Sequence, residues 1–361
     1  MSARGSVLVA MSGGVDSSVA ACLLAEQGYE VLGSHMNLVH LADGVDHGCC
    51  GPGARADAAE VARVAGFDLE IVDMSEDFEA TVLADFFAEH EAGRTPNPCT
   101  RCNEYIKFGA FLRRAEELGI DSVATGHYVR SSRDDAGPWH LLRGADPAKD
   151  QSYMLHTLGQ AALQRSLFPV GSMPKAETRA HAERFGLPVA GKPDSQEVCF
   201  VPGADHAAFL EQHAPSLVRP GEIVDVDGEV LGEHGGAFRY TIGQRRGLGV
   251  PSPEPRYVLE LDAQRNRVVV GPGELLARRG LVADRTSWVA GAPPSDEGPF
   301  EADVRIRYRG EDVPSVARVQ DDACVEVEFK SPQRGVAPGQ SVVFYRGDEL
   351  LGGARIVRAV R

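Results

Sequence analysis

The first two hundred residues alternate between short apolar runs and longer stretches with helical periodicity. Strands are predicted for the apolar, β-branched runs at 6–11, 31–36, 69–73 and 122–126. Helices are predicted for the periodic stretches at 16–28, 55–66 and 104–118. This rhythm predicts an α/β fold with a parallel sheet, whose ligands bind at the carboxyl ends of the strands.

Beyond residue 215 helical periodicity largely disappears, and short β-rich runs are separated by Gly, Pro and Asp turns. Strands are predicted at 222–226, 256–261, 266–270, 302–307, 316–319, 324–329, 341–346 and 354–358. This change predicts two small β-rich domains after the α/β domain. The expected division is a catalytic domain over 1–208, a central domain over 209–278 and a C-terminal domain over 279–361.

The first strand runs into the loop Ser12-Gly13-Gly14-Val15-Asp16-Ser17-Ser18, and a helical pattern follows at once. A strand, a tight loop and a helix N-terminus form an anion site, because free N–H groups and the helix dipole converge there. Glycine lets the backbone approach a phosphate closely. The loop lacks the Gly-Lys-Ser/Thr of a Walker loop and instead resembles that of the ATP pyrophosphatases, which use ATP to adenylate a substrate. The alternative is an ordinary βα turn.

The charge of the chain is unevenly distributed. The net charge of −15 argues against general nucleic-acid binding. Residues 1–236 hold 18 basic and 35 acidic side chains, whereas residues 237–361 hold 19 and 17. An RNA partner would therefore use local basic patches in the C-terminal third. No apolar run approaches the length of a membrane span, and the N-terminus leads directly into the first strand, so we expect a cytoplasmic protein with reduced thiols.

Three cysteines stand out among seven, two of them at CxxC spacing between helical stretches: Cys99, Cys102 and Cys199. Cys102 is expected near the start of a helix, where the dipole lowers the pKa of a thiol. Three interpretations stay open from the residues alone: a zinc site that includes Cys49 or Cys50, unreactive core thiols, and redox or sulfur chemistry.

Several long segments together resemble one family over nearly the whole chain. The segments are 12–18, 97–103, 126–128, 149–153, 195–200, 240–249, 305–309 and 338–340. They are similar to the bacterial tRNA-specific 2-thiouridylases (MnmA/TrmU) of the ATP pyrophosphatase (PP-loop) superfamily. The resemblance implies a Rossmann-like, adenine nucleotide α-hydrolase-like catalytic domain and a C-terminal β-barrel that binds tRNA.

The resemblance also implies a chemistry. With Mg²⁺, ATP adenylates the C2 oxygen of the wobble uridine at position 34, and sulfur held as a persulfide on Cys199 replaces that oxygen. Cys102 acts as the partner nucleophile in a two-cysteine disulfide cycle, and AMP and pyrophosphate leave. The implied partners are the anticodon arm of tRNA and a sulfur donor such as a cysteine desulfurase or a sulfur-carrier protein.

The family pattern assigns further site residues by position. The ATP-binding positions are Ala10, Met11, Ser12, Gly13, Gly14, Val15, Asp16, Ser17, Met36 and Gly126. The tRNA-binding positions are Asn97, Pro98, Cys99, His127, Lys149, Asp150, Gln151, Arg307, Tyr308 and Gln340. Asp16 is expected to help hold Mg²⁺. The role of the run Gln244-Arg245-Arg246 stays open.

One position departs from the family pattern, because the best-described members carry Asp where this chain has Cys99. This substitution raises an alternative in which Cys99, Cys102 and Cys199 ligate three irons of a [4Fe–4S] cluster whose fourth iron binds hydrosulfide. Two other functions are weighed against thiolation. One is a PP-loop ligase that adenylates a small molecule, and the other is a non-enzymatic iron–sulfur or zinc RNA-binding protein.

Overall fold

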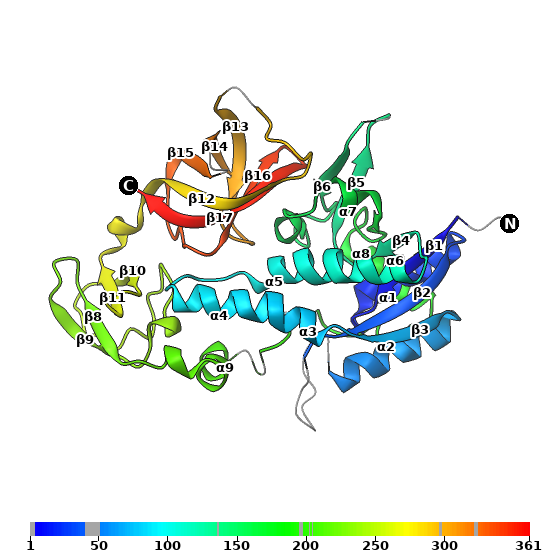
Figure 1. Ribbon diagram of the computed structural model, residues 1–361, viewed down its shortest axis with the longest axis horizontal. Coiled ribbons are helices and arrows are strands. Elements are labelled where there is room, and N and C mark those ends of the chain that lie inside the picture. Colours follow the sequence, from blue (N-terminus) through cyan, green and yellow to red (C-terminus); the bar gives the residue numbers. More distant parts are fainter. Residues whose placement is uncertain are drawn as a thin grey trace.

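The computed structural model describes residues 4–39, 51–135, 137–194, 198–201, 203, 205–295, 298–320 and 324–361. Figure 1 shows three bodies: an α/β layer at the N-terminal end, a small sheet at the opposite end, and a curled sheet formed by the C-terminal third. This arrangement confirms the predicted class of an α/β domain followed by β-rich domains.

The α/β layer is built on a parallel sheet in the order β3-β2-β1-β4-β7. Its strands are β1 (Ser6–Ala10), β2 (Glu30–Asn37), β3 (Asp68–Asp73), β4 (Ser122–Ala124) and β7 (Ser166–Leu167). Side chains of β1 alternate between the two faces, as a pleated strand requires. Leu8 packs into one core cluster, while Val7 and Val9 pack into another with residues of the first helix. Helices therefore cover both faces.

The helical elements of this region follow the predicted pattern closely at the start. They are α1 (Val15–Glu26), α2 (Pro52–Ala65), α3 (Ser75–Phe78), η2 (Glu79–Leu83), α4 (Ala84–Glu91), α5 (Pro98–Arg101), η3 (Cys102–Ala110), α6 (Phe111–Glu117), η4 (Ser152–Leu155), α7 (Gln160–Gln164) and α8 (Lys175–Arg184). The elements α5, η3 and α6 run on without a break, so the predicted helix at 104–118 begins a few residues earlier.

A small four-stranded sheet follows, in the order β10-β11-β8-β9. Its strands are β8 (Gly221–Val224), β9 (Val230–His234), β10 (Tyr257–Asp262) and β11 (Arg267–Gly271). Short helices flank it: α9 (His206–His213), η6 (Pro215–Leu217), η7 (Ala237–Arg239) and η8 (Gly273–Leu276). Ile223, Val258, Val268 and Val270 form its buried core.

The C-terminal third closes into a barrel. Its strands are β12 (Arg278–Trp288), β13 (Phe300–Arg305), β14 (Val313–Val319), β15 (Val325–Gln333), β16 (Ser341–Arg346) and β17 (Glu349–Val360). They pair in the order β12-β15-β14-β13-β16-β17, and β12 pairs again with β17. That second pairing joins the two ends of the sheet, so the barrel implied by the family resemblance is present.

A hairpin from the α/β region extends the barrel sheet, which the sequence pattern did not predict. It consists of β5 (Val129–Arg133) and β6 (Trp139–Arg143), and β6 pairs with β17 through Leu142 and Leu141. As a result, Leu141 and Tyr153 share one buried core with Val343, Tyr345 and Leu350 of the barrel. The two bodies are therefore one packed unit.

The strands β9 and β12 were also missed. β12 begins with two arginines and shifts register twice against β17, so its sequence does not alternate cleanly between apolar and polar positions.

The domain bounds 1–208, 209–278 and 279–361 stay a prediction. In the part of the chain that the structure describes, no helix is long and apolar enough to cross a membrane.

Candidate active site

The serine–glycine loop joins β1 to α1 and closes on itself. The Ser17 hydroxyl accepts a hydrogen bond from the Ser12 amide at 3.2 Å and lies 3.1 Å from the Ser12 hydroxyl. The Ser18 hydroxyl donates to the Gly14 carbonyl at 2.8 Å. Gly13 has φ +66°, and a Cβ there would lie 2.2 Å from the Ala54 carbonyl oxygen of α2, so only glycine fits. The loop thus presents the N-terminus of α1, as an anion site requires.

Gly126, after β4, lies directly against this loop. A Cβ on Gly126 would be 2.6 Å from the Ser17 amide nitrogen and 2.7 Å from the Asp16 carbonyl carbon. The absence of a side chain therefore lets the two strand ends meet, as the strand–helix pattern predicts. Met36 lies near the end of β2, as the predicted strand 31–36 placed it, and is half-buried against the core. Met11 is 1% exposed, and its carbonyl oxygen lies 2.8 Å from His35 Nδ1.

A cation that the sequence did not point to, Lys175 at the start of α8, completes the loop. Its Nζ lies 2.6 and 2.8 Å from the two carboxylate oxygens of Asp16 and 2.8 Å from Asp194. The Tyr128 hydroxyl donates to Asp16 at 2.8 Å. Lys175 is 159 positions from Asp16 and stands in an ordinary polar helix, so no local pattern could have found it.

Asp194 gathers further cations around the same point. Lys149 Nζ lies 2.7 Å from its carboxylate and Arg179 lies 3.1 Å away, besides Lys175. Burial would raise the pKa of Asp194, but the hydrogen bonds from Lys149 and Lys175 outweigh it and lower that pKa to about 2. Lys149, Lys175 and Arg179 against Asp16 and Asp194 leave a local excess of one positive charge, which suits a polyphosphate.

The predicted role of Asp16 in holding Mg²⁺ stays a prediction. Both of its carboxylate oxygens already accept hydrogen bonds from Lys175. Within the described ranges, no group of three His, Cys, Asp or Glu side chains could hold a metal ion. In this structure Asp16 is a partner of Lys175.

The predicted cysteine segment begins at Asn97, which caps the short helix α5. Its side chain accepts a hydrogen bond from the Thr100 amide at 3.3 Å. Cys99 is exposed, whereas Cys102 is 8% exposed and belongs to the large core cluster. Cys199 is partly exposed and packs against that same cluster. The fold therefore brings the two predicted catalytic cysteines to one core, across 97 positions of sequence.

The cysteines bear on the metal and disulfide expectations. None of the five described cysteines forms a disulfide, so the expected disulfide is not supported. The described part of the chain also does not gather Cys99, Cys102 and Cys199 as three ligands of one metal site. On the helix, Cys102 is buried whereas Cys99 is exposed to solvent. Cys49 and Cys50, the alternative zinc ligands, lie outside the described residues.

Several residues expected to bind tRNA have contacts inside the protein. Asp150 is 7% exposed and accepts hydrogen bonds from Ser152 and, at 3.3 Å, from Arg305. The Gln151 side chain accepts one from the Tyr128 amide at 2.9 Å. His127 is buried 2.8 Å from the Thr125 hydroxyl, and burial holds the pKa of its ring well below the usual range. The described contacts of these three residues are therefore with neighbouring parts of the protein.

Arg307 and Tyr308, in contrast, stand at the surface of the barrel. Arg307 is exposed, and Tyr308 is half-buried with its ring 6.2 Å from that of Tyr153. Burial raises the pKa of Tyr308. The Gln340 amide donates instead to the carbonyl oxygens of Thr95 and Pro96, at 3.0 and 3.1 Å.

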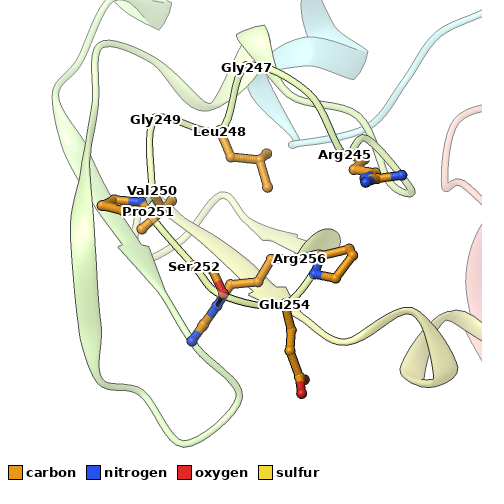
Figure 2. Close-up of a pocket in the computed structure, with 10 residues that line it drawn as sticks. Arg245, Gly247, Leu248, Gly249, Val250, Pro251, Ser252, Glu254 and Arg256 are labelled. Atoms are coloured by element: carbon orange, nitrogen blue, oxygen red, sulfur yellow. Dashed lines mark hydrogen bonds between the residues drawn. The ribbon is translucent and has the colours of Figure 1, made fainter.

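Two hollows formed by the described residues lie away from the serine–glycine loop. One of about 420 Å³ lies in the central domain and is lined by ten residues between Arg245 and Arg256 (Figure 2). Another, of about 340 Å³, lies between the hairpin and the barrel, where Arg143 and Arg305 flank Asp150. The first contains none of the predicted site residues, and the second contains only Asp150.

Known families match the three bodies in turn. Residues 5–203 match a family described as "tRNA methyl transferase HUP domain", 207–272 one described as "tRNA methyl transferase PRC-barrel domain", and 278–356 one described as "Aminomethyltransferase beta-barrel domain". The first match alone spans more than half of the chain.

Curated relatives match from end to end. The chain is 48% identical to tRNA-specific 2-thiouridylase MnmA of Geobacter metallireducens, covering 99% of this chain and 98% of that protein. It is 47% identical to the protein of that name from Geotalea uraniireducens (99% and 96% covered) and from Symbiobacterium thermophilum (98% and 92%). A solved 4-thiouridine synthetase–RNA complex with bound ATP is a weak likeness, at 18% identity and a TM-score of 0.37 over 59% of this chain and 51% of that one.

Proposed function

This chain belongs to the MnmA family of tRNA-specific 2-thiouridylases, and from that premise we propose how its two regions divide the reaction. The enzyme is an ATP-dependent sulfurtransferase that acts on tRNA. The serine–glycine loop and Lys175 serve the adenylation step, and the two cysteines serve the sulfur step. The observation that carries this division is the ion pair of Lys175 with Asp16 at the loop, with Nζ 2.6 and 2.8 Å from the two carboxylate oxygens, in a chain that also places Cys102 and Cys199 against one core cluster.

In the adenylation step, the C2 oxygen of the target uridine attacks the α-phosphorus of ATP. A P–O bond forms to the uridine oxygen, the bond between the α-phosphorus and the bridging oxygen breaks, and pyrophosphate leaves. The β- and γ-phosphates lie at the N-terminus of α1, whose N–H groups face them. Lys175 and Lys149 exchange carboxylate partners for phosphate oxygens and stabilise the charge that develops on the leaving pyrophosphate.

In the sulfur step, the terminal sulfur of a persulfide on Cys199 attacks C2. The C–S bond forms and the C2–O bond to AMP breaks, which is favourable because AMP is a far better leaving group than oxide. The Cys102 thiolate then attacks the Sγ of Cys199, and the S–S bond to the transferred sulfur breaks. A Cys102–Cys199 disulfide results transiently, and a dithiol reductant restores both thiols. A cysteine desulfurase or a sulfur-carrier protein supplies the persulfide.

RNA binding is assigned to the junction of the barrel and the central domain. Arg307 is exposed beside Tyr308, and an arginine with an aromatic ring can stack on a splayed base. Gly335 lies against Arg307, because a Cβ on Gly335 would be 3.7 Å from the Arg307 guanidinium. Gly243 lies against Gly335 in turn, because a Cβ on Gly243 would be 3.9 Å from the Gly335 Cα. The exposed Arg245 and Arg246 follow Gly243 after Gln244, so this surface extends to the run whose role the sequence left open.

The experiment that tests the function measures products with and without bulk tRNA. With tRNA we expect AMP, pyrophosphate and 2-thiouridine, the last read by mass spectrometry of nucleoside digests. ADP and phosphate as the products would contradict adenylation. AMP formed at the full rate without tRNA would favour a small-molecule ligase instead.

Cys99 separates the persulfide mechanism from the cluster mechanism. Under the persulfide mechanism, anaerobically purified enzyme needs no iron, and Cys99→Asp keeps most of its activity. Under the cluster mechanism, the protein is brown with about four irons per chain, and Cys99→Asp bleaches it. Among the described residues, Cys99, Cys102 and Cys199 do not form a group of three metal ligands, which supports the persulfide mechanism.

A further inference from the structure

The barrel holds the segment that leads into Cys99 and Cys102. The Thr95 amide donates a hydrogen bond to the Pro338 carbonyl at 2.8 Å. The Gln340 side-chain amide donates to the Thr95 and Pro96 carbonyls at 3.0 and 3.1 Å. Three hydrogen bonds therefore fix the backbone of two consecutive residues, Thr95 and Pro96, immediately before the Asn97 cap of α5, to a part of the chain more than 240 positions away.

Gly339 lets the two backbones come this close. A Cβ there would lie 2.7 Å from the Thr95 carbonyl oxygen and 2.9 Å from its backbone nitrogen, and φ at Gly339 is +91°, in the left-handed region. The Gly339 amide donates to the Ile356 carbonyl at 2.8 Å, and the Ile356 amide donates to Gln340 at 2.8 Å. The segment 338–340 is thus itself locked to β17 and cannot follow a moving loop.

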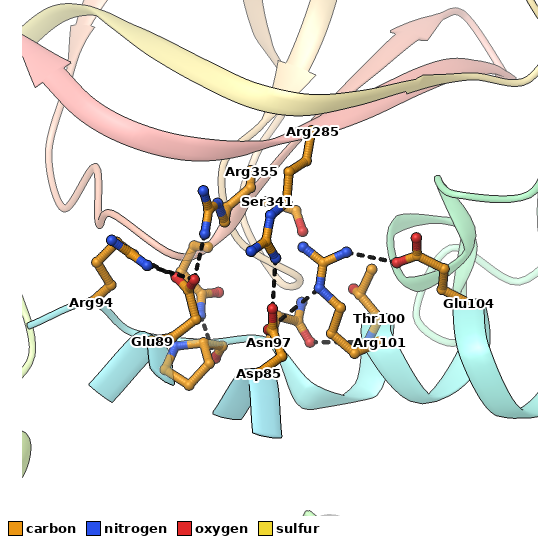
Figure 3. A network of polar contacts seen from close by, with 12 residues as sticks. Asp85, Glu89, Arg94, Asn97, Thr100, Arg101, Glu104, Arg285, Ser341 and Arg355 are labelled. Atoms are coloured by element: carbon orange, nitrogen blue, oxygen red, sulfur yellow. Dashed lines mark hydrogen bonds and ion pairs between the residues drawn. The ribbon is translucent and has the colours of Figure 1, made fainter. Parts of the chain in front are cut away.

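Ion pairs hold the same two bodies together around this point (Figure 3). Glu89 of α4 is 2% exposed and pairs with Arg94 at 2.6 Å and with Arg355 of β17. Asp85 of α4 pairs with Arg285 of β12 at 2.6 Å and with Arg101 at 3.4 Å. Breaking one partner of a buried pair leaves an uncompensated charge, so this junction resists separation.

We propose that residues 338–340 form a clamp through which the barrel sets the position of the cysteine segment, with Gln340 as its positioning residue. The proposal rests on the proposed function, in which Cys102 must meet Cys199. It rests on the contacts of Gln340 with Thr95 and Pro96. Arg307 belongs to the same barrel, so one body both docks RNA and places the cysteines.

Gln340→Met tests the clamp, because methionine keeps the length of the side chain but removes both donors. We expect kcat for thiolation to fall by about 10- to 100-fold, the size of effect that a misplacement of about 1 Å produces, while KM for tRNA changes less than twofold. Gln333→Met is the matched control, since the Gln333 amide donates only to Ser331 at the barrel surface.

A second readout reports the cysteine segment without catalysis. Iodoacetamide alkylation of Cys102, followed by mass spectrometry, should become several-fold faster in Gln340→Met because the buried thiol gains exposure. Cys22, buried in α1, is the internal reference and should react as slowly as in the unmodified chain, which shows that the α/β layer stays folded. This readout still tests the clamp if the chain proves not to thiolate tRNA.

Two results would overturn the proposal. A rise in KM for tRNA, with kcat and Cys102 alkylation unchanged, would make Gln340 an RNA contact. Unchanged KM, kcat and alkylation would show that the three hydrogen bonds do not hold the segment in solution.

Discussion

The nucleotide loop and the cysteine segment reach their geometry in opposite ways. The loop takes its shape from its own strand, turn and helix, with Ser12 and Ser17 bonded across five positions. The cysteine segment is held by residues of another body, through Thr95 and Gln340. A motif whose shape comes from local contacts can be predicted from the sequence. For a motif held by tertiary contacts, the sequence shows the residues of the motif but not the distant residues that hold it.

Their charges differ in the same way. Asp16 keeps a side chain that is 30% exposed beside Lys175, so water or a phosphate can reach the pair and replace its partner. Glu89, at the junction behind the cysteine segment, is 2% exposed between two arginines. The first pair is suited to exchange with a ligand, and the second is suited to fix a structure.

The largest expected effect separates the two regions by assay. Cys102→Ser and Cys199→Ser should each lower 2-thiouridine formation by at least about 10³-fold, since a hydroxyl neither carries nor releases persulfide sulfur. Release of pyrophosphate in the presence of tRNA should continue. Cys324→Ser, in the barrel, is the control and should behave as the unmodified chain. Ordinary levels of 2-thiouridine from either variant would reject the assignment.

Substitutions at the nucleotide loop should give the converse result. Lys175→Met and Asp16→Asn should each slow pyrophosphate release by about 10²- to 10³-fold, the usual size for losing one electrostatic contact in a transition state. Alkylation of Cys102 should not change. If Asp16 acts through Lys175, the double variant should be little slower than either single one. Lys330→Met, which removes an exposed pair with Glu301, is the control. Fully additive losses would give Asp16 a role of its own.

This contrast also explains what the sequence could predict. The order of β1, the loop and α1 follows from local hydrophobic and glycine patterns. The place of Gly126 beside the loop follows because the carboxyl ends of parallel strands lie at the same edge of the sheet. Lys175, Asp194 and the Gln340 clamp are brought in by tertiary packing, and ordinary polar residues carry no local signal of it. The hairpin β5–β6 was missed for a related reason, since its partner strand β17 lies some 200 positions away.

A smaller effect tests whether RNA docks on the barrel. Arg307→Ala in the full chain should raise KM for tRNA about 10-fold, the cost of losing one stacked or phosphate-bound arginine, and leave ATP binding unchanged. Arg318→Ala, on the exposed side of β14, is the matched control. A truncation would not serve, because Val343 and Tyr345 share a core with Leu141 of the hairpin. An unchanged KM would move the RNA surface elsewhere.

The smallest expected effect probes how firmly the junction behind the cysteines is closed. His156 is 3% exposed there, with Nε2 3.0 Å from the Ser341 hydroxyl, and burial lowers the pKa of its ring to about 3. The ring stays neutral in the folded chain and becomes protonated on unfolding below about pH 6.5, its usual pKa. Its contribution to stability is therefore complete above pH 6.5 and is lost as the pH falls toward 3.

His156→Gln should remove the share of the pH dependence that His156 contributes. One such group changes the free energy of unfolding by at most about 1.4 kcal/mol per pH unit, so between pH 7 and pH 5 the unmodified chain should lose up to about 2 kcal/mol more than the variant. The measurement is the urea midpoint at both pH values. His127→Gln is the comparison in the nucleotide region, where burial also holds the pKa low, so that in a single cooperative unfolding both variants should flatten the pH dependence. If the His127 variant flattens the pH dependence and the His156 variant does not, the junction opens to water before the α/β layer unfolds. The barrel could then not hold the cysteine segment rigidly, and the claim that tertiary contacts with the barrel fix this segment would be wrong.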